Sequence, residues 1–141
     1  MSERAPVAAV NLDALLAEAR TARGRAYAPY SRFYAGAAVA TDAGVFAGAN
    51  VENASYGLSI CAERVAAASA VASGARRIEA VAIAGSGPLP TPPCGGCRQF
   101  LYEFNPGMTV LSEGLNGERK QRRLSELLVD GFGPSDLPGS A

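Results

Sequence analysis

The chain has 141 residues, 48% of them hydrophobic, which suits one compact domain with a core of its own. Thirteen basic residues balance thirteen acidic ones, and this zero net charge argues against nucleic acid or an anionic membrane as the main partner. Histidine is absent, which excludes Ser-His-Asp hydrolysis, Cys-His proteolysis and imidazole–metal sites.

The first half of the chain predicts one helix and one hairpin. Residues 11–23 have helical periodicity, with Asn11 as a possible cap and Gly24 as a possible end. The apolar runs 33–40 and 45–49 are separated by Thr-Asp-Ala-Gly and predict a β-hairpin.

The second half alternates helices with strands. Residues 61–73 are rich in alanine, lack Gly and Pro, and predict a helix that Gly74 ends. Further predicted elements are a strand at 78–84, a helix at 97–104, a strand at 109–111 and a helix at 124–128. This order predicts an α/β fold with three α/β/α layers, in which helices cover both faces of a mixed sheet of about five strands.

We expect a single domain over residues 1–141, because there is no internal repeat and no long linker. Both tails, including 133–141, are expected to be loose. Residues 119–123 contain four basic side chains without interleaved aromatics, so we predict a solvated, exposed stretch there.

The cysteines indicate metal binding. No segment approaches the roughly 20 apolar residues of a membrane span, and residues 1–10 lack the core of a signal peptide. We therefore expect a cytoplasmic protein whose thiols stay reduced. An odd cysteine number, with Cys94 and Cys97 at Cys-x-x-Cys spacing, then favours a metal site over disulfides.

Three thiols can complete three corners of a tetrahedral zinc site. Cys61, Cys94 and Cys97 would leave the fourth position for water, as in catalytic zinc sites. Predicted helix starts at Cys61 and Cys97 would stabilise thiolates, and Arg64 or Arg98 could offset the negative charge. The residues alone leave open a structural metal site, a redox pair, and iron in place of zinc.

Glu63 follows Cys61 by two residues, so on a helix the two side chains point about 200° apart and do not ligate one ion. Near a helix start, Glu63 could instead reach around a substrate held over the metal and act as a proton shuttle. The alternative is that Glu63 is an ordinary residue on the exposed surface of a helix, with no catalytic role.

Cys61-Ala62-Glu63 followed by Pro-Cys-Gly-Gly-Cys is the signature of zinc-dependent nucleobase deaminases, with Cys in place of the usual His. The other motifs are residues 27–33 (YAPYSRF), 36–38 (GAA), 50–56 (NVENASY), 61–64 (CAER) and 93–99 (PCGGCRQ). On these residues the chain resembles the small homotetrameric, three-cysteine cytidine deaminases from about residue 12 to 137.

The resemblance implies a cytidine-deaminase-like fold and hydrolytic deamination of free cytidine and deoxycytidine to uridine and deoxyuridine plus ammonia, a step of pyrimidine salvage. It implies one Zn²⁺ per chain held by Cys61, Cys94 and Cys97, with zinc-bound hydroxide attacking C4 and Glu63 carrying protons. It also implies a homotetramer with shared active sites, and neither nucleic acid nor membrane as partner.

The resemblance further assigns residues to substrate binding. The N–H of Ala62 would hold O2 of the base, Asn50 and Glu52 would bind the ribose hydroxyls, and Phe33 would pack on the pyrimidine. The alternatives are a core role for Phe33 and ordinary turn roles for Asn50 and Glu52.

The resemblance also implies residues that act in a neighbouring subunit and residues that balance the charge of the thiolates. Tyr56 and Phe132 would be contributed to neighbouring subunits, although Phe132 could simply anchor the tail. Arg64, held by Gln99, would temper the thiolate charge.

Other functions remain as alternatives. Deaminases of modified cytosine nucleosides, such as blasticidin S, share the cysteine motifs but lack the ribose motif at residues 50–53. A zinc-stabilised structural protein without turnover and a polynucleotide-editing enzyme are further alternatives, the latter disfavoured by the zero net charge. The sequence does not rank cytidine against deoxycytidine.

Overall fold

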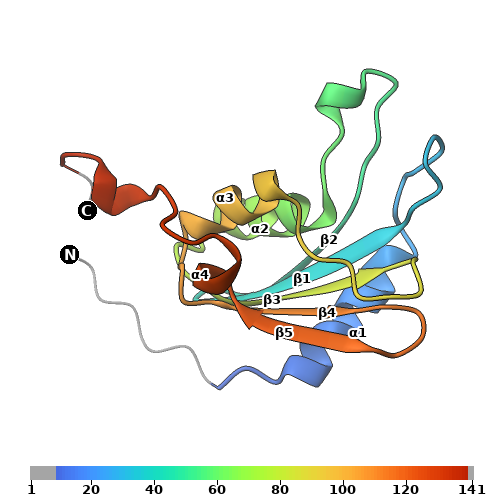
Figure 1. The fold of residues 1–141 in the computed structure, drawn as a ribbon, viewed down its shortest axis with the longest axis horizontal. Coiled ribbons are helices and arrows are strands. Elements are labelled where there is room, and N and C mark those ends of the chain that lie inside the picture. Colours follow the sequence, from blue (N-terminus) through green and yellow to red (C-terminus); the bar gives the residue numbers. More distant parts are fainter. Residues whose placement is uncertain (1–8, 140–141) are drawn as a thin grey trace.

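The computed structural model describes residues 9–139, so the predicted N-terminal tail lies almost entirely outside the described residues (Figure 1). The helices are α1 (Leu12–Arg23), α2 (Ala62–Ala72), α3 (Gly95–Tyr102) and α4 (Leu124–Leu127), with short 3₁₀ helices η1 (Tyr56–Leu58) and η2 (Pro134–Asp136). The strands are β1 (Ala35–Thr41), β2 (Gly44–Ala49), β3 (Ile78–Gly85), β4 (Thr109–Glu113) and β5 (Arg119–Arg123).

The five strands form one mixed sheet in the order β2-β1-β3-β4-β5. Only β3 and β4 run parallel, with Ala80 opposite Thr109, and α3 makes the crossover between them. The other three pairs are antiparallel. The crossover leaves β3 through residues 86–94 and so brings Cys94 to the end of the sheet where α2 begins.

Helices cover both faces of this sheet, which confirms the predicted three-layer architecture (Figure 1). On one face α1 buries Leu15, Leu16 and Ala19 against alanines of β1 and β3. On the other face α2 and α3 pack on the valines and isoleucines of the same strands, with Leu101 fully buried.

Two glycines explain how closely the layers approach. A Cβ at Gly36 would lie 2.0 Å from the carbonyl oxygen of Ala19 in α1, and a Cβ at Gly48 would lie 2.5 Å from the backbone nitrogen of Ala66 in α2. Because any side chain there would collide with helix backbone, the alanine- and glycine-rich composition is what this packing requires.

The helix ends follow the predicted signals. The side-chain oxygen of Asn11 accepts the N–H of Ala14 at 3.0 Å and caps α1. Beyond the last residue of α2, Gly74 adopts φ 107, a conformation that side chains rarely permit. None of the helices within residues 9–139 is long and apolar enough to cross a membrane.

Three predicted boundaries differ from the structure. The strand expected from residue 33 begins at Ala35, because side chains rather than a neighbouring strand bind the backbone of Phe33. The run 119–123 is exposed as predicted, but it is also a strand, β5, paired with β4. The tail expected to be loose contains η2, where the N–H of Gly133 donates to Asp136 at 2.8 Å.

Candidate metal centre and nucleoside site

Cys61 and Cys94 each occupy the N-cap position of a helix. Both are extended, with φ −73 and ψ 152 at Cys61 and φ −67 and ψ 167 at Cys94. Pairing of Val51 with Ile60 fixes the chain just ahead of Cys61. The sulfur of Cys94 accepts the N–H of Cys97 at 3.4 Å. The partial positive charge of both helix ends favours thiolates at these positions.

The three sulfurs meet the geometric requirement for a zinc ion. All lie within 4.8 Å of one another, and Sγ of Cys61 is 3.8 Å from Sγ of Cys94. Zn–S bonds of about 2.3 Å at tetrahedral angles would place two sulfurs roughly 3.8 Å apart. Cys97 is buried, Cys61 is half-buried and Cys94 is exposed, so the cluster opens toward solvent on one side.

One of the two candidate cations faces the thiols. A terminal nitrogen of Arg64 lies 3.8 Å from Sγ of Cys61, and its Nε is buried without a hydrogen-bond partner among the described residues. Arg98 instead donates to the carbonyls of Pro93 and Leu127, both at 2.8 Å. Arg98 therefore fixes the loop that carries Cys94, and the expectation that it offsets thiolate charge is not supported by its contacts.

The thiols of Cys61 and Cys97 shift each other's pKa in opposite directions. Hydrogen bonding from Cys97 lowers the pKa of Cys61 to about 5, with further contributions from Arg64 and Cys94. The same hydrogen bond, together with burial, raises the pKa of Cys97. The surroundings therefore favour the thiolate form of Cys61, the N-cap residue of α2.

Glu63 lies in the first turn of α2 and only 5% of it is exposed. Burial, supported by the negative charge of Cys61, raises the pKa of its carboxyl group. Ala62 precedes it as the first residue of the helix, where a backbone N–H has no intrahelical acceptor. A buried carboxyl group and the first backbone N–H of a helix thus lie close to the thiols.

A second group of predicted residues surrounds the start of β1. The amide of Asn50 donates to the carbonyl of Phe33 and accepts the N–H of Ala35, both at 2.8 Å. Glu52 accepts the N–H of Ser31 at 3.1 Å and also its hydroxyl. Phe33 is 37% exposed, so it is not the core residue that its apolar neighbours suggested.

Comparison with known proteins identifies the family. Residues 9–113 match the family model described as the cytidine and deoxycytidylate deaminase zinc-binding region. The chain belongs to this deaminase family. The three-cysteine cluster fits the single zinc ion per chain that the family name and the sulfur geometry indicate.

Relatives in this deaminase family resemble the chain over most of its length. A cytidine deaminase of Halalkalibacterium halodurans is 46% identical over 125 residues, which cover 87% of this chain and 95% of that protein. One from Mycobacterium tuberculosis is 40% identical over 130 residues, 92% of this chain and 95% of that protein. A crystal structure of a Burkholderia pseudomallei cytidine deaminase, 45% identical, superposes with a TM-score of 0.83 and covers 87% of this chain and 100% of that one.

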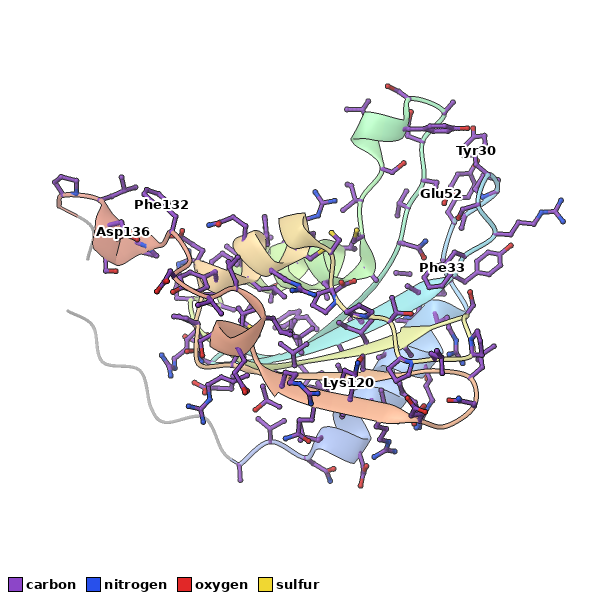
Figure 2. All side chains as sticks on the ribbon, in the orientation of Figure 1. Tyr30, Phe33, Glu52, Lys120, Phe132 and Asp136 are labelled. Atoms are coloured by element: carbon purple, nitrogen blue, oxygen red, sulfur yellow. The ribbon has the colours of Figure 1, made fainter. Side chains whose placement is uncertain are left out.

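Two predicted nucleoside-site residues of this deaminase chain are strongly exposed. Tyr56 is 75% exposed on the arm formed by residues 51–60, where its ring is 6.0 Å from that of Tyr30. Phe132 is 56% exposed in the C-terminal segment. Figure 2 shows Phe132 and Phe33 at opposite ends of the molecule, so one chain does not bring them together.

Gln99 does not hold Arg64 in this structure. Its side-chain nitrogen donates to the carbonyl of Phe132 at 2.8 Å, and the hydrogen bonds within residues 9–139 include none between Gln99 and Arg64. The physical reason is that the C-terminal segment returns over α3 and offers a carbonyl within reach. Gln99 therefore places Phe132 rather than the guanidinium.

The ring of Tyr102 also shapes this C-terminal segment. A Cβ at Gly131 would lie 2.8 Å from the ring, and one at Gly133 would lie 2.9 Å from it. Glycines on both sides of Phe132 thus let the backbone lie on the ring while the phenyl group points outward. A Gly-Phe-Gly sequence is the signal that could have predicted this contact.

Sequence reasoning assigned no role to Ser31, although it lies within the motif at residues 27–33. Its hydroxyl contacts both Glu52 and the N–H of Phe33. A serine two residues before a functional side chain can accept the N–H of that residue in an ST-turn, and this spacing was the available signal.

Proposed function

We propose that this chain catalyses the hydrolytic deamination of free cytidine and deoxycytidine to uridine and deoxyuridine plus ammonia. The observation that carries the proposal is a buried glutamate, Glu63, beside three thiols at two helix N-termini. The named activity of relatives up to 46% identical supports it. The alternative of a purely structural zinc site gives no reason for a buried carboxyl group in this position.

Cys61, Cys94 and Cys97 would hold the zinc ion. Bound there, zinc supplies a water molecule whose pKa is lowered toward neutrality. Arg64, 3.8 Å from Cys61, offsets part of the charge of three thiolates. This compensation keeps the site from losing its pull on a bound water molecule.

Glu63 carries the protons in the proposed reaction. Burial raises the pKa of its carboxyl group, which favours the protonated form that can deliver a proton to a base such as N3 of the ring. A second proton, taken from the hydroxyl group that the attacking water leaves on C4, then passes through the same carboxyl group to the departing amino group as the C4–N bond breaks. The N–H of Ala62, at the first position of α2, is free to donate to O2 of the pyrimidine.

Asn50, Glu52 and Phe33 would receive the nucleoside. The amide nitrogen of Asn50 retains one N–H beyond its bond to Phe33. The carboxylate of Glu52 has about four acceptor positions and uses three of them on Tyr30 and Ser31. One donor and one acceptor therefore remain for ribose hydroxyls, next to a half-exposed phenyl ring for the base.

We further propose a homotetramer that shares its active sites. Tyr56 and Phe132 are aromatic side chains that are 75% and 56% exposed in the single chain. Assembly would cover them and bring them to neighbouring sites. The three free cysteines are consistent with a cytoplasmic role in pyrimidine salvage, without nucleic acid or membrane as partner.

The test is cytidine turnover by the purified protein, followed as the fall in absorbance at about 280–290 nm, with zinc measured on the same sample. Glu63→Gln should keep one zinc per chain and lose turnover by about 10²-fold or more, because the amide cannot carry a proton. A Glu63→Gln variant with wild-type rate would contradict the shuttle. Turnover of blasticidin S but not of cytidine would redirect the proposal to modified nucleosides.

A further inference from the structure

The hydroxyl of Ser31 lies between two residues that the proposed function assigns to the nucleoside. It donates to Oε2 of Glu52 and accepts the N–H of Phe33 at 3.0 Å. Oε1 of the same carboxylate accepts the N–H groups of Tyr30 at 3.0 Å and Ser31 at 3.1 Å. One serine side chain thus joins the predicted ribose ligand to the predicted base platform.

The backbone of Phe33 is held by side chains and not by a neighbouring strand. It precedes β1, so no neighbouring strand pairs with it, and its carbonyl accepts the side chain of Asn50. Its ring lies over Gly85, where a Cβ would come within 3.1 Å of Cζ. The Ser31 hydroxyl supplies the remaining backbone partner and so completes the placement of the ring.

The backbone between Ser31 and Phe33 is also constrained. Arg32 has φ 58, a left-handed conformation that costs free energy for a residue with a side chain. A residue keeps such a conformation only where neighbouring interactions hold its backbone. Here the hydrogen bonds of Ser31 and Asn50 to the backbone of Phe33 hold the chain next to Arg32. Figure 2 shows Tyr30, Glu52 and Phe33 gathered at this end of the molecule.

The carboxylate end of this arrangement is open. Tyr30, Ser31 and Glu52, together with Tyr56 and Ser59, line a hollow of about 310 Å³. Hydrogen bonding from the Ser31 side chain is the largest influence lowering the pKa of Glu52, with the two backbone N–H groups adding to it. These bonds orient the carboxylate before any ligand arrives and favour its ionised form.

We propose that Ser31 is a positioning residue for nucleoside binding: its hydroxyl sets the carboxylate of Glu52 and the backbone of Phe33 in mutually fixed positions. The proposal rests on the proposed function, since it acts through residues assigned there to ribose and base. Its effect falls on substrate affinity, because Ser31 does not touch the cysteines or the reacting atoms.

The test compares Ser31→Ala with Ser31→Thr, which keeps the hydroxyl, and with Ser86→Ala as a matched control. The hydroxyl of Ser86 also accepts a backbone N–H, that of Tyr34 at 2.8 Å, but contacts neither Glu52 nor Phe33. Steady-state kinetics are measured with cytidine and with 2′,3′-dideoxycytidine, which lacks the 2′- and 3′-hydroxyls that the proposal assigns to Glu52.

Ser31→Ala should raise KM for cytidine about tenfold with kcat little changed. The variant loses the hydrogen bond from Ser31 to the charged Glu52, and with it the orientation of a residue that binds substrate in the ground state. KM for dideoxycytidine should rise less, because Glu52 has no hydroxyl to bind there. Ser31→Thr should restore most of the affinity, and Ser86→Ala should stay near wild type.

A KM for cytidine in Ser31→Ala equal to that of Ser86→Ala would overturn the assignment while leaving the proposed function intact. The same holds if Ser31→Thr is as impaired as Ser31→Ala, or if both nucleosides suffer equally. If the wild-type chain itself fails to deaminate cytidine, the proposed function is wrong, and the assignment of Ser31 is rejected with it.

Discussion

At the scale of single residues, the sulfur of Cys94 has two functions that can be separated. It accepts the N–H of Cys97 as the cap of α3, and it is one of the three metal ligands. A serine hydroxyl can replace the first function, because Ser is a strong N-cap, but it is a poor substitute for a thiolate on zinc.

We therefore expect Cys94→Ser and Cys94→Ala both to lose zinc. With chelator present, Cys94→Ser should be more stable than Cys94→Ala by about 1 kcal/mol, the usual worth of a cap. Zinc analysis and urea unfolding would measure the two effects. Full zinc occupancy in either variant would contradict the ligand set, and equal stability would contradict the capping role.

Residue-scale predictions succeed where spacing carries the information. Two cysteines at Cys-x-x-Cys spacing and a third at a helix start predicted a thiol cluster, and the structure brings all three together. The partner of Gln99 was predicted wrongly. Its side chain can reach several groups, and which one it meets depends on where the C-terminal segment returns, information that no local pattern contains.

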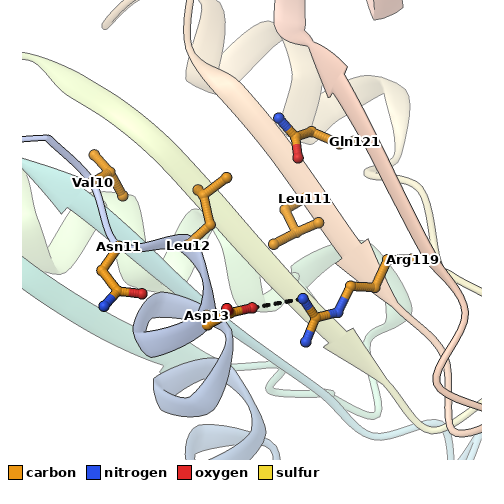
Figure 3. Close-up of a pocket in the computed structure, with 7 residues that line it drawn as sticks. All are labelled: Val10, Asn11, Leu12, Asp13, Leu111, Arg119 and Gln121. Carbon is orange, nitrogen blue, oxygen red and sulfur yellow. Dashed lines mark hydrogen bonds and ion pairs between the residues drawn. The ribbon is translucent and has the colours of Figure 1, made fainter.

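At the scale of elements, an ion-pair network ties α1 to the end of the sheet. Arg20 of α1 binds both oxygens of Glu113 at 2.8 Å, and Arg119 of β5 binds Glu113 at 3.1 Å and Asp13 at 2.7 Å. Figure 3 shows the Asp13–Arg119 pair beside the groove between α1 and β5. Hydrogen bonding from Arg20 is the main cause that lowers the pKa of Glu113.

The lowered pKa predicts an acid-sensitive contribution to stability. Since the folded state favours the ionised carboxylate, this contribution is full above the unfolded pKa of about 4.3 and is lost as pH falls through the lower folded value. Glu113→Gln should lower the melting temperature near pH 7, and the difference from wild type should shrink below about pH 4. Glu118→Gln, on an exposed turn, is the control and should change little at either pH. A difference that does not depend on pH would contradict the network's ionic origin.

The edge strand β5 illustrates what periodicity misses. All five of its residues are exposed, so neither face carries the alternation that predicts strands. The same charges protect the edge: Lys120 and Arg122 lie opposite Ser112 and Val110 of β4, and their repulsion discourages pairing with another copy.

Replacing Lys120 and Arg122 together with valine should therefore promote aggregation. We expect concentration-dependent light scattering to rise well above wild type, because the edge becomes apolar and keeps its unpaired backbone groups. The Lys120→Gln, Arg122→Gln pair removes the charges without adding apolar surface and should scatter less. Unchanged scattering in the valine variant would show that something else protects this edge.

At the scale of the whole molecule, the layers were predictable from local patterns, whereas the assembly surface was expected only from the family resemblance. Alanine-rich helices and apolar strands in alternation lead to a three-layer fold. The arm at residues 51–60 carries Tyr56 and Leu58, which are 75% and 67% exposed, and only the family resemblance assigned Tyr56 to a neighbouring subunit. A single chain offers no local reason for such exposure, so the reason must be sought in what covers the arm.

The proposed tetramer would account for this exposure and can be tested directly. Light scattering with size-exclusion chromatography should give four times the chain mass of 14.4 kDa. Leu58→Glu should shift the protein to smaller species and lower activity in parallel, since a charge on the arm would be costly to bury. Glu118→Gln again serves as control. A fully active monomer would contradict shared active sites.

The two cysteines that begin α2 and α3 are 33 positions apart along the chain, and a shared ion would tie them together. Such an ion would act as a reversible crosslink that stabilises the folded state. The fraction of folded protein would then rise and fall with the concentration of available metal, by mass action. In a zinc-starved cell, chains made at an unchanged rate would spend more time open to proteases. The proposed deaminase activity would then decline with the supply of zinc, without any dedicated regulator.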